Sequence, residues 1–126
     1  MDLGSFSVSL AVDDLDASIA FYTKLGFVQH AEVGEMRYVI LTNGDHVIGL
    51  FEKMFDKNIL TFNPGWNQAA QEVAEFTDVR VLADELEAAG LTLVERPDPD
   101  SDGPAHITLE DPDGNPILID QHRPKP

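Results

Sequence analysis

The chain has 126 residues and a mass of 13.9 kDa, which suffices for one domain with a sizeable core. Its formal net charge of −15 opposes binding to nucleic acid, which needs a basic surface, and the absence of cysteine excludes disulfides and thiolate chemistry. No apolar run could span a bilayer, and the first residues lack a signal-peptide pattern, so we expect a cytoplasmic protein with no membrane partner. An acidic wall can attract a cationic small molecule, although a solvated, solubilising surface is the simpler interpretation.

The first predicted strand covers residues 5–12, because large and small side chains alternate there. The large apolar set is Phe6, Val8, Leu10 and Val12. We expect this set to pack under a helix. Ser7, Ser9 and Ala11 form the other face, where a simply wet surface would carry larger charged side chains. That face is therefore predicted to line a concavity.

A short helix is predicted over residues 15–25, because both of its ends are marked. Asp14 can cap the free N–H groups of the first turn, and Gly26 supplies a left-handed exit. An apolar stripe lies between them at helical spacing. It consists of Leu15, Ile19, Tyr22 and Leu25.

The same plan recurs over residues 79–89, with Asp78 as the cap and Gly90 as the exit. The second stripe consists of Val79, Leu82, Leu86 and Ala89. Because Gly26 and Gly90 lie 64 positions apart in a chain of 126, we interpret the sequence as an internal duplication.

Each copy is predicted to continue into further strands and a tight hairpin, at Asn43-Gly44 and at Asp113-Gly114. The further strands of the first copy cover residues 27–32, 36–42 and 46–51. The strands of the second copy cover residues 71–77, 91–95, 105–110 and 115–120. The second copy carries about six extra residues, which we place in a loop over residues 97–103.

Gly49 interrupts one of these strands. A glycine in mid-strand costs stability, so it indicates a bulge or a close approach to the backbone, or else it is simply tolerated.

An aromatic connection joins the two copies. We divide the single domain into a first module over residues 5–52, this connection over residues 53–69, and a second module over residues 70–122. The connection holds four large apolar side chains, which a flexible linker would not carry. They are Met54, Phe55, Phe62 and Trp66. They could pack onto the domain, form a lid over a ligand, or be covered by a partner, and we expect a homodimer.

Several of these segments resemble the vicinal oxygen chelate superfamily, which contains glyoxalase I, extradiol dioxygenases, fosfomycin-resistance enzymes and bleomycin-binding proteins. The segments are residues 12–15 (Val-Asp-Asp-Leu), residues 21–27, and residues 110–116 (Glu-Asp-Pro-Asp-Gly-Asn-Pro). The resemblance covers nearly the whole chain. It implies an α+β fold in which two βαβββ modules form a cup of curled mixed sheets.

The resemblance also implies positions for a divalent metal, which the superfamily's enzymes hold with His, Glu or Gln from the first and last strand of each module. The matching positions here are Ser7, Gly49, Gln71 and Leu118. Glycine and leucine have no donor atom, a neutral hydroxyl is a poor ligand, and one amide does not hold a metal. We therefore expect neither a metal nor another cofactor.

The predicted pocket is instead suited to a largely apolar or aromatic ligand, oriented by a few hydrogen bonds. Its residues are Ser7, Ser9, Gly49, Phe51, Phe62, Trp66, Gln71 and Leu118, with Trp66 at the rim. The four histidines, expected at the surface, form no spaced cluster; they are His30, His46, His106 and His122. Glu52 and Glu95 lie at strand ends that could hold a general base.

Three hypotheses about function remain open, and the sequence does not decide whether the protein is an enzyme. The first is a metal-free small-molecule binder that works by sequestration, as in the bleomycin-binding branch. The second is a lyase, isomerase or dioxygenase-like enzyme with a displaced metal or an acid–base pair. The third is a non-catalytic dimeric scaffold.

Overall fold

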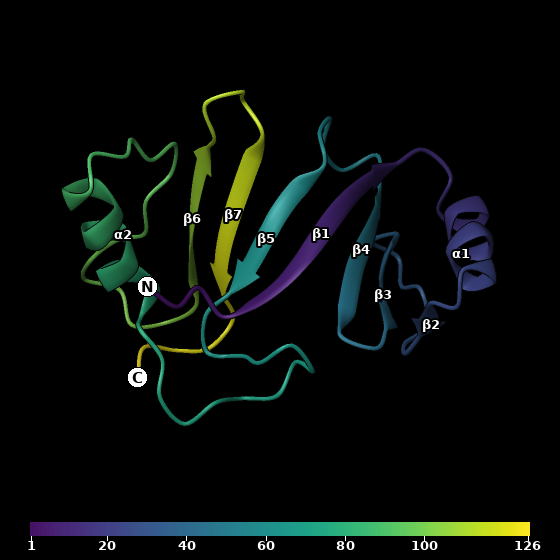
Figure 1. Cartoon of the computed structure of the whole chain (residues 1–126), viewed down its shortest axis with the longest axis horizontal. Helices are drawn as coiled ribbons and strands as arrows, with labels where there is room; N and C mark the ends of the chain where they lie inside the picture. Colours follow the sequence, from purple (N-terminus) through teal and green to yellow (C-terminus); the bar gives the residue numbers. More distant parts are fainter. The chain divides into compact units, whose positions relative to one another are not determined.

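A computed structural model describes residues 1–126, in which seven strands and two helices follow one another along the chain (Figure 1). The elements are β1 (Ser5–Val12), α1 (Leu15–Lys24), β2 (Val28–Gln29), β3 (Tyr38–Asn43), β4 (His46–Glu52), β5 (Ile59–Asn63), α2 (Val79–Ala88), β6 (Ala105–Glu110) and β7 (Pro116–Gln121). They divide into two compact units. The N-terminal unit is Ser7–Ile59, and the C-terminal unit comprises Met1–Phe6 and Leu60–Pro126. Neither helix is long and apolar enough to cross a membrane.

In the N-terminal unit, β1 runs parallel to β4, and β2, β3 and β4 follow as antiparallel neighbours. Helix α1 packs on one face of this sheet. The core between them consists of Leu15, Val39, Leu41 and Leu50, with Leu10, Val12, Ile19 and Tyr22 packed against it. The apolar face predicted for residues 5–12 thus packs under a helix in Leu10 and Val12, whereas Phe6 is 39% exposed and contacts Phe62, and Val8 is not part of the core.

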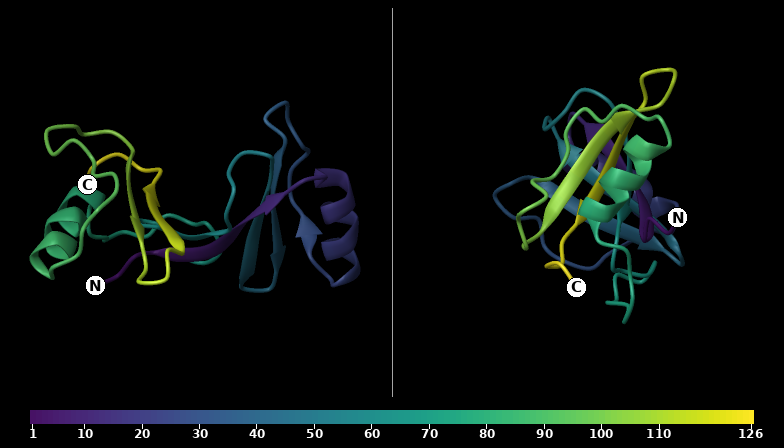
Figure 2. Two further views of the ribbon diagram at one scale, coloured as in Figure 1. Left: turned by 90° about the horizontal axis from the view of Figure 1, so that it is seen from above. Right: turned by 90° about the vertical axis from the view of Figure 1, so that its left-hand side faces the viewer.

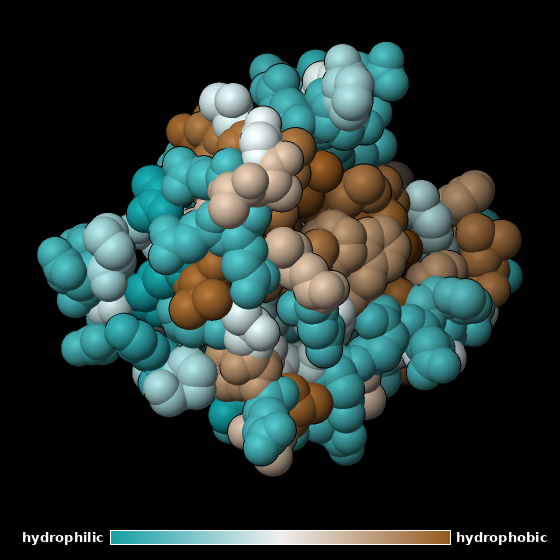
Figure 3. All heavy atoms as spheres, turned by 60° about the vertical axis from the view of Figure 1, so that its left-hand side comes forward, coloured by the Kyte–Doolittle hydropathy of each residue, from teal (hydrophilic) through white to brown (hydrophobic).

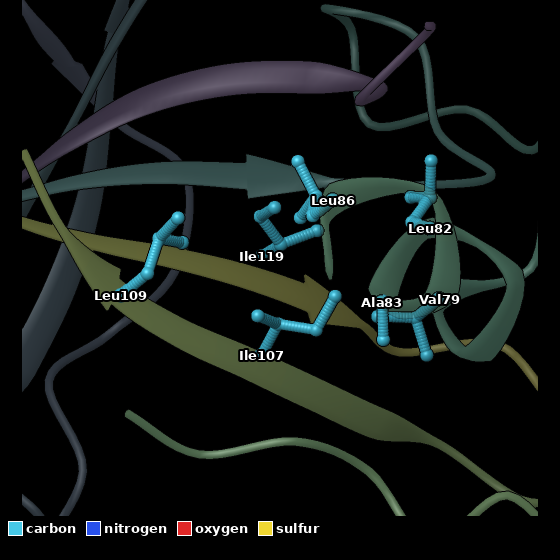
Figure 4. Close-up of a cluster of buried hydrophobic side chains, with 7 residues drawn as sticks. All are labelled: Val79, Leu82, Ala83, Leu86, Ile107, Leu109 and Ile119. Carbon is cyan, nitrogen blue, oxygen red and sulfur yellow. The ribbon is translucent and has the colours of Figure 1, made fainter. Parts of the chain in front are cut away.

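The C-terminal unit repeats this arrangement with β5 parallel to β7 and β6 antiparallel to β7 (Figures 1 and 2). Figure 4 shows the apolar side of α2 facing the β6–β7 hairpin. The buried side chains are Val79, Leu82, Ala83, Leu86, Ile107, Leu109 and Ile119. The expected stripe is confirmed in Val79, Leu82 and Leu86, whereas Ala89 is exposed and Ala83 is buried in its place.

The helix ends follow the sequence prediction closely. Asp14 accepts a hydrogen bond from Ala17 N, and Asp78 accepts one from Arg80 N. The chain leaves α1 and α2 through Gly26 and Gly90, whose φ angles of +97° and +92° suit glycine. Leu25, expected in the first stripe, lies beyond α1 and is 58% exposed.

The first strand of the second copy lies elsewhere than predicted. Residues 71–77 form no strand, apart from one isolated bridge between Trp66 and Glu72. The strand that runs parallel to β7 is β5, inside the segment that the sequence assigned to the connection. β5 reads Ile-Leu-Thr-Phe-Asn, is rich in residues that favour strands, and ends at Pro64-Gly65. Of the strand expected over residues 91–95, only Glu95 pairs, with Thr108.

A buried polar network joins α2, the end of β7 and the loop at residues 97–103. The Asp78 carboxylate accepts from Arg80 Nη1 at 2.8 Å and from Gln121 Nε2 at 2.9 Å. Arg80 also donates to Ser101 Oγ and to the carbonyl of Gly103. Arg80, Asp78 and Gln121 are 5%, 4% and 0% exposed, and no buried side-chain polar atom lacks a partner.

We expect Arg80→Leu to lower the free energy of unfolding by about 3–5 kcal/mol, because it leaves the buried Asp78 carboxylate without its cation. Arg96→Leu is the matched control, since Arg96 pairs with the exposed acids Asp84 and Glu87 and should cost less than about 1 kcal/mol. Urea denaturation followed by circular dichroism measures both values. Equal losses for the two variants would contradict the role of the network.

Candidate functional site

The face of the N-terminal sheet turned away from α1, here called the helix-free face, carries half of the predicted pocket, namely four of its eight residues. Strand register places its side chains in rows from β1 across β4 to β3. One row is Ser9, Gly49 and Ile40, and the next is Ala11, Phe51 and Tyr38. Ser7 lies two residues before Ser9 on the same face. This face therefore combines small residues along β1 with large apolar ones along β3.

Three aromatic rings form a continuous cluster on this face, here called the aromatic ladder. Tyr38 and Phe51 are stacked with ring centroids 5.4 Å apart and planes 8° apart. Phe55, three residues after the end of β4, also packs against Phe51, with ring centroids 5.4 Å apart and an interplanar angle of 46°. Tyr38 is 43% exposed and its neighbour Ile40 is 42% exposed, so the ladder offers apolar surface to a ligand.

The Phe51 ring of the aromatic ladder explains why a glycine stands at position 49 in the middle of β4. The pairing of β4 with β3 runs through Gly49 without a break, so the glycine does not mark a bulge. A Cβ at this position would lie 2.5 Å from Phe51 Cε2 and 3.1 Å from Ile40 Cδ1. The group that approaches the backbone closely is thus the chain's own Phe51 ring, which uses the space above Gly49.

The other predicted pocket residues belong to the C-terminal unit. Phe62 packs against the C-terminal core, with its ring centroid 5.1 Å from that of Phe6. Trp66 is half-buried and stacks on His122, and Gln71 is exposed in a loop where its side chain binds Asn67. Leu118 lies on the helix-free face of the C-terminal unit.

The shift of the first strand changes one of the four positions implied for a metal. Ser9 pairs with Gly49 in the N-terminal unit, and Thr61 pairs with Leu118 in the C-terminal unit. The position that corresponds to Ser7 is therefore Ile59, whereas the resemblance implied Gln71, which lies outside any strand.

The corrected set does not fit a divalent metal. Ser7, Gly49, Ile59 and Leu118 offer one hydroxyl and no charged or imidazole donor. No group of three or more His, Cys, Asp or Glu side chains gathers anywhere in the chain in a way that could hold a metal ion.

The helix-free face of the C-terminal unit carries a set of polar side chains, four of them titratable, that the sequence did not reveal, here called the polar array. Its members are Glu95, His106, Thr108, Asp120 and His122. Glu95 accepts from Thr108 Oγ1 at 3.1 Å and lies 3.6 Å from His106 Nε2. Asp120 is the cross-strand neighbour of His106 and lies 3.2 Å from His122 Nε2. The alternation of His106 with Ile107 and of Asp120 with Ile119 was the signal that could have grouped these residues.

The pKa of His122 is raised and that of Glu52 is lowered, each by its hydrogen-bond partners. The hydrogen bond with Asp120 raises the pKa of His122, against the opposing effect of partial burial. The hydrogen bond from Arg37, followed by that from Leu15 N, lowers the pKa of Glu52. Glu52 is therefore held as a carboxylate that supports the fold, and it is poorly suited to the general-base role considered from the sequence.

An NMR titration of the His122 imidazole should give a midpoint above the usual histidine value, and Asp120→Asn should lower it. Because the pKa is raised on folding, the stabilisation is fully present below the unfolded value of about 6.5 and is lost as pH rises through the folded pKa. The difference in free energy of unfolding between wild type and Asp120→Asn should therefore shrink as the pH rises through the folded pKa of His122.

Asp113→Asn serves as the control, since it removes a carboxylate from the exposed β6–β7 turn of the same unit. A His122 midpoint that responds equally to both variants, or to neither, would contradict the ion pair.

The twofold sequence of strand, helix and antiparallel hairpin, with one helix over each sheet, defines a duplicated α+β protein. The sequence profile of the Glyoxalase/Bleomycin resistance protein/Dioxygenase superfamily matches residues 4–119. The chain belongs to this superfamily, as the resemblance of residues 12–27 and 110–116 indicated.

Solved structures agree with this fold. A member of the same superfamily from Vibrio splendidus 12B01 is 17% identical, with a TM-score of 0.63 over 92% of this chain and 97% of its own. A protein from Legionella pneumophila described as an NAD-dependent benzaldehyde dehydrogenase is 14% identical, with a TM-score of 0.64 over 94% and 99%. A catechol 2,3-dioxygenase is 22% identical, with a TM-score of 0.59 over 98% of this chain and 42% of its own. At these identities the likeness shows the fold alone. Among curated proteins, no sequence matches this chain.

Proposed function

We propose that this protein binds a small, planar aromatic molecule without using a metal, and that the aromatic ladder is the surface that binds it. The observation that carries the proposal is the stacked pair of Tyr38 and Phe51 on a partly exposed face, with the Phe51 ring over Gly49. Aromatic rings gain about 0.5–1.5 kcal/mol per stacked or edge-to-face pair beyond the area that they bury. Binding alone would protect against such a compound by sequestering it.

The charge of the chain favours a cationic ligand among planar aromatic ones. A net charge of −15 raises the local concentration of cations near the surface. The two rows of side chains on the helix-free face contain no basic residue that would repel a cation. Selectivity for the cation would therefore come from the field of the whole protein, and affinity from the rings.

An enzyme that works by acid–base catalysis is the second candidate, and the polar array supports it. His122 beside Asp120 and His106 beside Glu95 provide two imidazole–carboxylate pairs in which a proton could be taken up or released. A lyase or isomerase of this kind would need no metal. Stoichiometric metal retained through purification without added metal would contradict both the metal-free binder and the metal-free acid–base enzyme.

Proflavine, a planar cation, should bind saturably, and Phe51→Leu should weaken its binding about tenfold, or about 1.4 kcal/mol, because the central ring is lost. Gly49→Ala should act in the same direction, since the added methyl displaces the Phe51 ring. Fluorescence polarisation of the dye measures each dissociation constant, and circular dichroism reports whether the variants fold.

Phe21→Leu is the matched control, because it removes an aromatic ring that is 59% exposed on α1, away from the ladder. Neutral acridone should bind more weakly than proflavine and with less dependence on salt. An equal loss in Phe21→Leu and Phe51→Leu, or no saturable binding of either compound, would contradict the proposal.

We also propose that the protein is a homodimer, as expected from the sequence, but through a different surface. Of the four side chains on which the expectation rested, Phe55, Phe62 and Trp66 find partners within their own units, and only Met54, at 46%, stays largely exposed. Large apolar side chains are instead exposed on α1 and after it. They are Phe21 at 59%, Leu25 at 58% and Val28 at 54%.

Light scattering at micromolar concentration should give twice the chain mass of 13.9 kDa, and Leu25→Glu should shift the protein towards the monomer. Val94→Glu, which places the same charge on an exposed apolar residue of the C-terminal unit, is the control. A monomer at this concentration would contradict the dimer.

A further inference from the structure

The connection between β5 and α2 is much longer than its counterpart in the N-terminal unit. Two residues separate β1 from α1, whereas the β5–α2 loop, residues 64–78, has fifteen. Loops longer than about 12–15 residues without secondary structure are uncommon in compact domains, and those that are ordered are usually functional. The extra length of this loop therefore indicates a functional role.

Side chains hold this loop in one conformation where strand pairing cannot. Arg123 Nη1 donates to the carbonyls of Gly65 at 2.9 Å and Val73 at 2.7 Å, and the guanidinium lies 4.6 Å from the centroid of Phe76. The Gln68 amide accepts from Phe6 N and donates to Phe6 O, as a neighbouring strand would. The Asn67 side chain accepts from two further backbone N–H groups of the loop.

The first residues of the chain close against the loop. Gly4 has a φ of +82°, and a Cβ there would lie 2.0 Å from the carbonyl oxygen of Asn63, so only glycine fits. Asp2 Oδ1 accepts from Gly4 N at 2.8 Å, which fixes the carboxylate beside the loop. The other carboxylate oxygen has no hydrogen-bond partner, and Asp2 belongs to no ion pair.

A cavity of about 200 Å³ lies between the loop and these first residues. Its lining includes the rings of Trp66 and Phe76, the side chain of Val73 and the acid Asp2. The lining combines these two rings and Val73 with polar groups, and Asp2 is its one charged member, while the Arg123 guanidinium lies next to it against Phe76. The volume is below the range of about 300–1,000 Å³ that drug-sized ligands occupy, so the cavity suits a small head group.

Both aromatic walls are held by neighbours. Trp66 stacks on His122 with ring centroids 4.7 Å apart and planes 3° apart, and Phe76 lies against Arg123. The indole N–H of Trp66 makes no hydrogen bond in the structure. The ring positions are therefore fixed before a ligand arrives, which lowers the cost of binding, and the ring surface not covered by His122 and Arg123 is what a ligand can contact.

We propose that this cavity binds a small organic ammonium group, quaternary or methylated, with Trp66 and Phe76 as its aromatic walls and Asp2 as its counter-ion. Aromatic rings attract such cations through their negative faces, and a carboxylate adds the charge that a neutral compound of the same shape cannot use. The site lies wholly within the C-terminal unit and goes beyond the function proposed for the aromatic ladder.

Choline and 3,3-dimethylbutan-1-ol test this site, because they have the same shape and differ in charge. Trp66 is the sole tryptophan, so its fluorescence reports on the cavity directly. Choline should change the fluorescence saturably in the millimolar range, and the neutral alcohol should bind at least about tenfold more weakly. Equal binding of the two compounds, or no response to choline, would overturn the proposal.

Asp2→Asn is the sharpest variant, because asparagine keeps the oxygen that accepts from Gly4 N and removes only the charge. It should weaken choline about tenfold and leave the alcohol unchanged. Glu35→Gln removes the same charge from an exposed turn of the N-terminal unit and should have no effect. Equal effects of the two variants would mean a general charge effect and would overturn the site.

Phe76→Leu should weaken choline while calorimetry shows whether the fold is kept. Phe51→Leu should leave choline binding unchanged, because that ring belongs to the aromatic ladder. Failure of the ammonium site and failure of the ladder are therefore read from different variants and different compounds. Choline binding that Phe51→Leu abolishes and Phe76→Leu spares would overturn the assignment to this cavity.

Discussion

One hydrogen bond, present once in each unit, sets the arrangement on which the rest depends. The first N–H of α1, at Leu15, donates to Glu52 Oε2 at 2.8 Å, and the first N–H of α2, at Val79, donates to Gln121 Oε1 at 2.7 Å. In both units the acceptor is the last residue of the strand that runs parallel to the first one. The bond satisfies a helix N–H that has no partner within the helix, and it holds the helix to one face of the sheet. The second face of each sheet is thereby left without a helix.

The two units keep this bond but surround it with different chemistry. Glu52 is held by Arg37, which lowers its pKa, so the N-terminal unit uses an ion pair near the surface. Gln121 is fully buried and is oriented by Asp78, which in turn pairs with Arg80. A neutral amide suits the buried position, because an unpaired carboxylate there would lose its hydration without compensation. The buried version also extends to Ser101 and Gly103, and so it orders the loop that the second copy adds.

Because the cores lie between helix and sheet, the helix-free faces could diverge without loss of packing. One face carries the stacked rings of Tyr38 and Phe51, and the other carries the imidazole–carboxylate pairs of His106 and His122. Neither retains the donor set that the superfamily's enzymes use for a metal. The same division explains why membership of the superfamily does not assign a reaction, since function resides in the side chains of these faces and the fold does not dictate them.

Local signals in the sequence determined the helices, their caps at Asp14 and Asp78 and the strand at residues 105–110, because caps and periodicity act between residues a few positions apart. They also predicted both hairpins, although the first turn lies at Gly44-Asp45 and the second is a loop over residues 111–115. Only the tertiary structure decided which segment begins the second copy, since β5 is defined by its parallel pairing with β7, more than fifty residues further along the chain. It alone showed that the Phe51 ring occupies the space above Gly49, and that His106 lies opposite Asp120, because alternation gives the face on which a side chain lies, whereas its cross-strand partner depends on register.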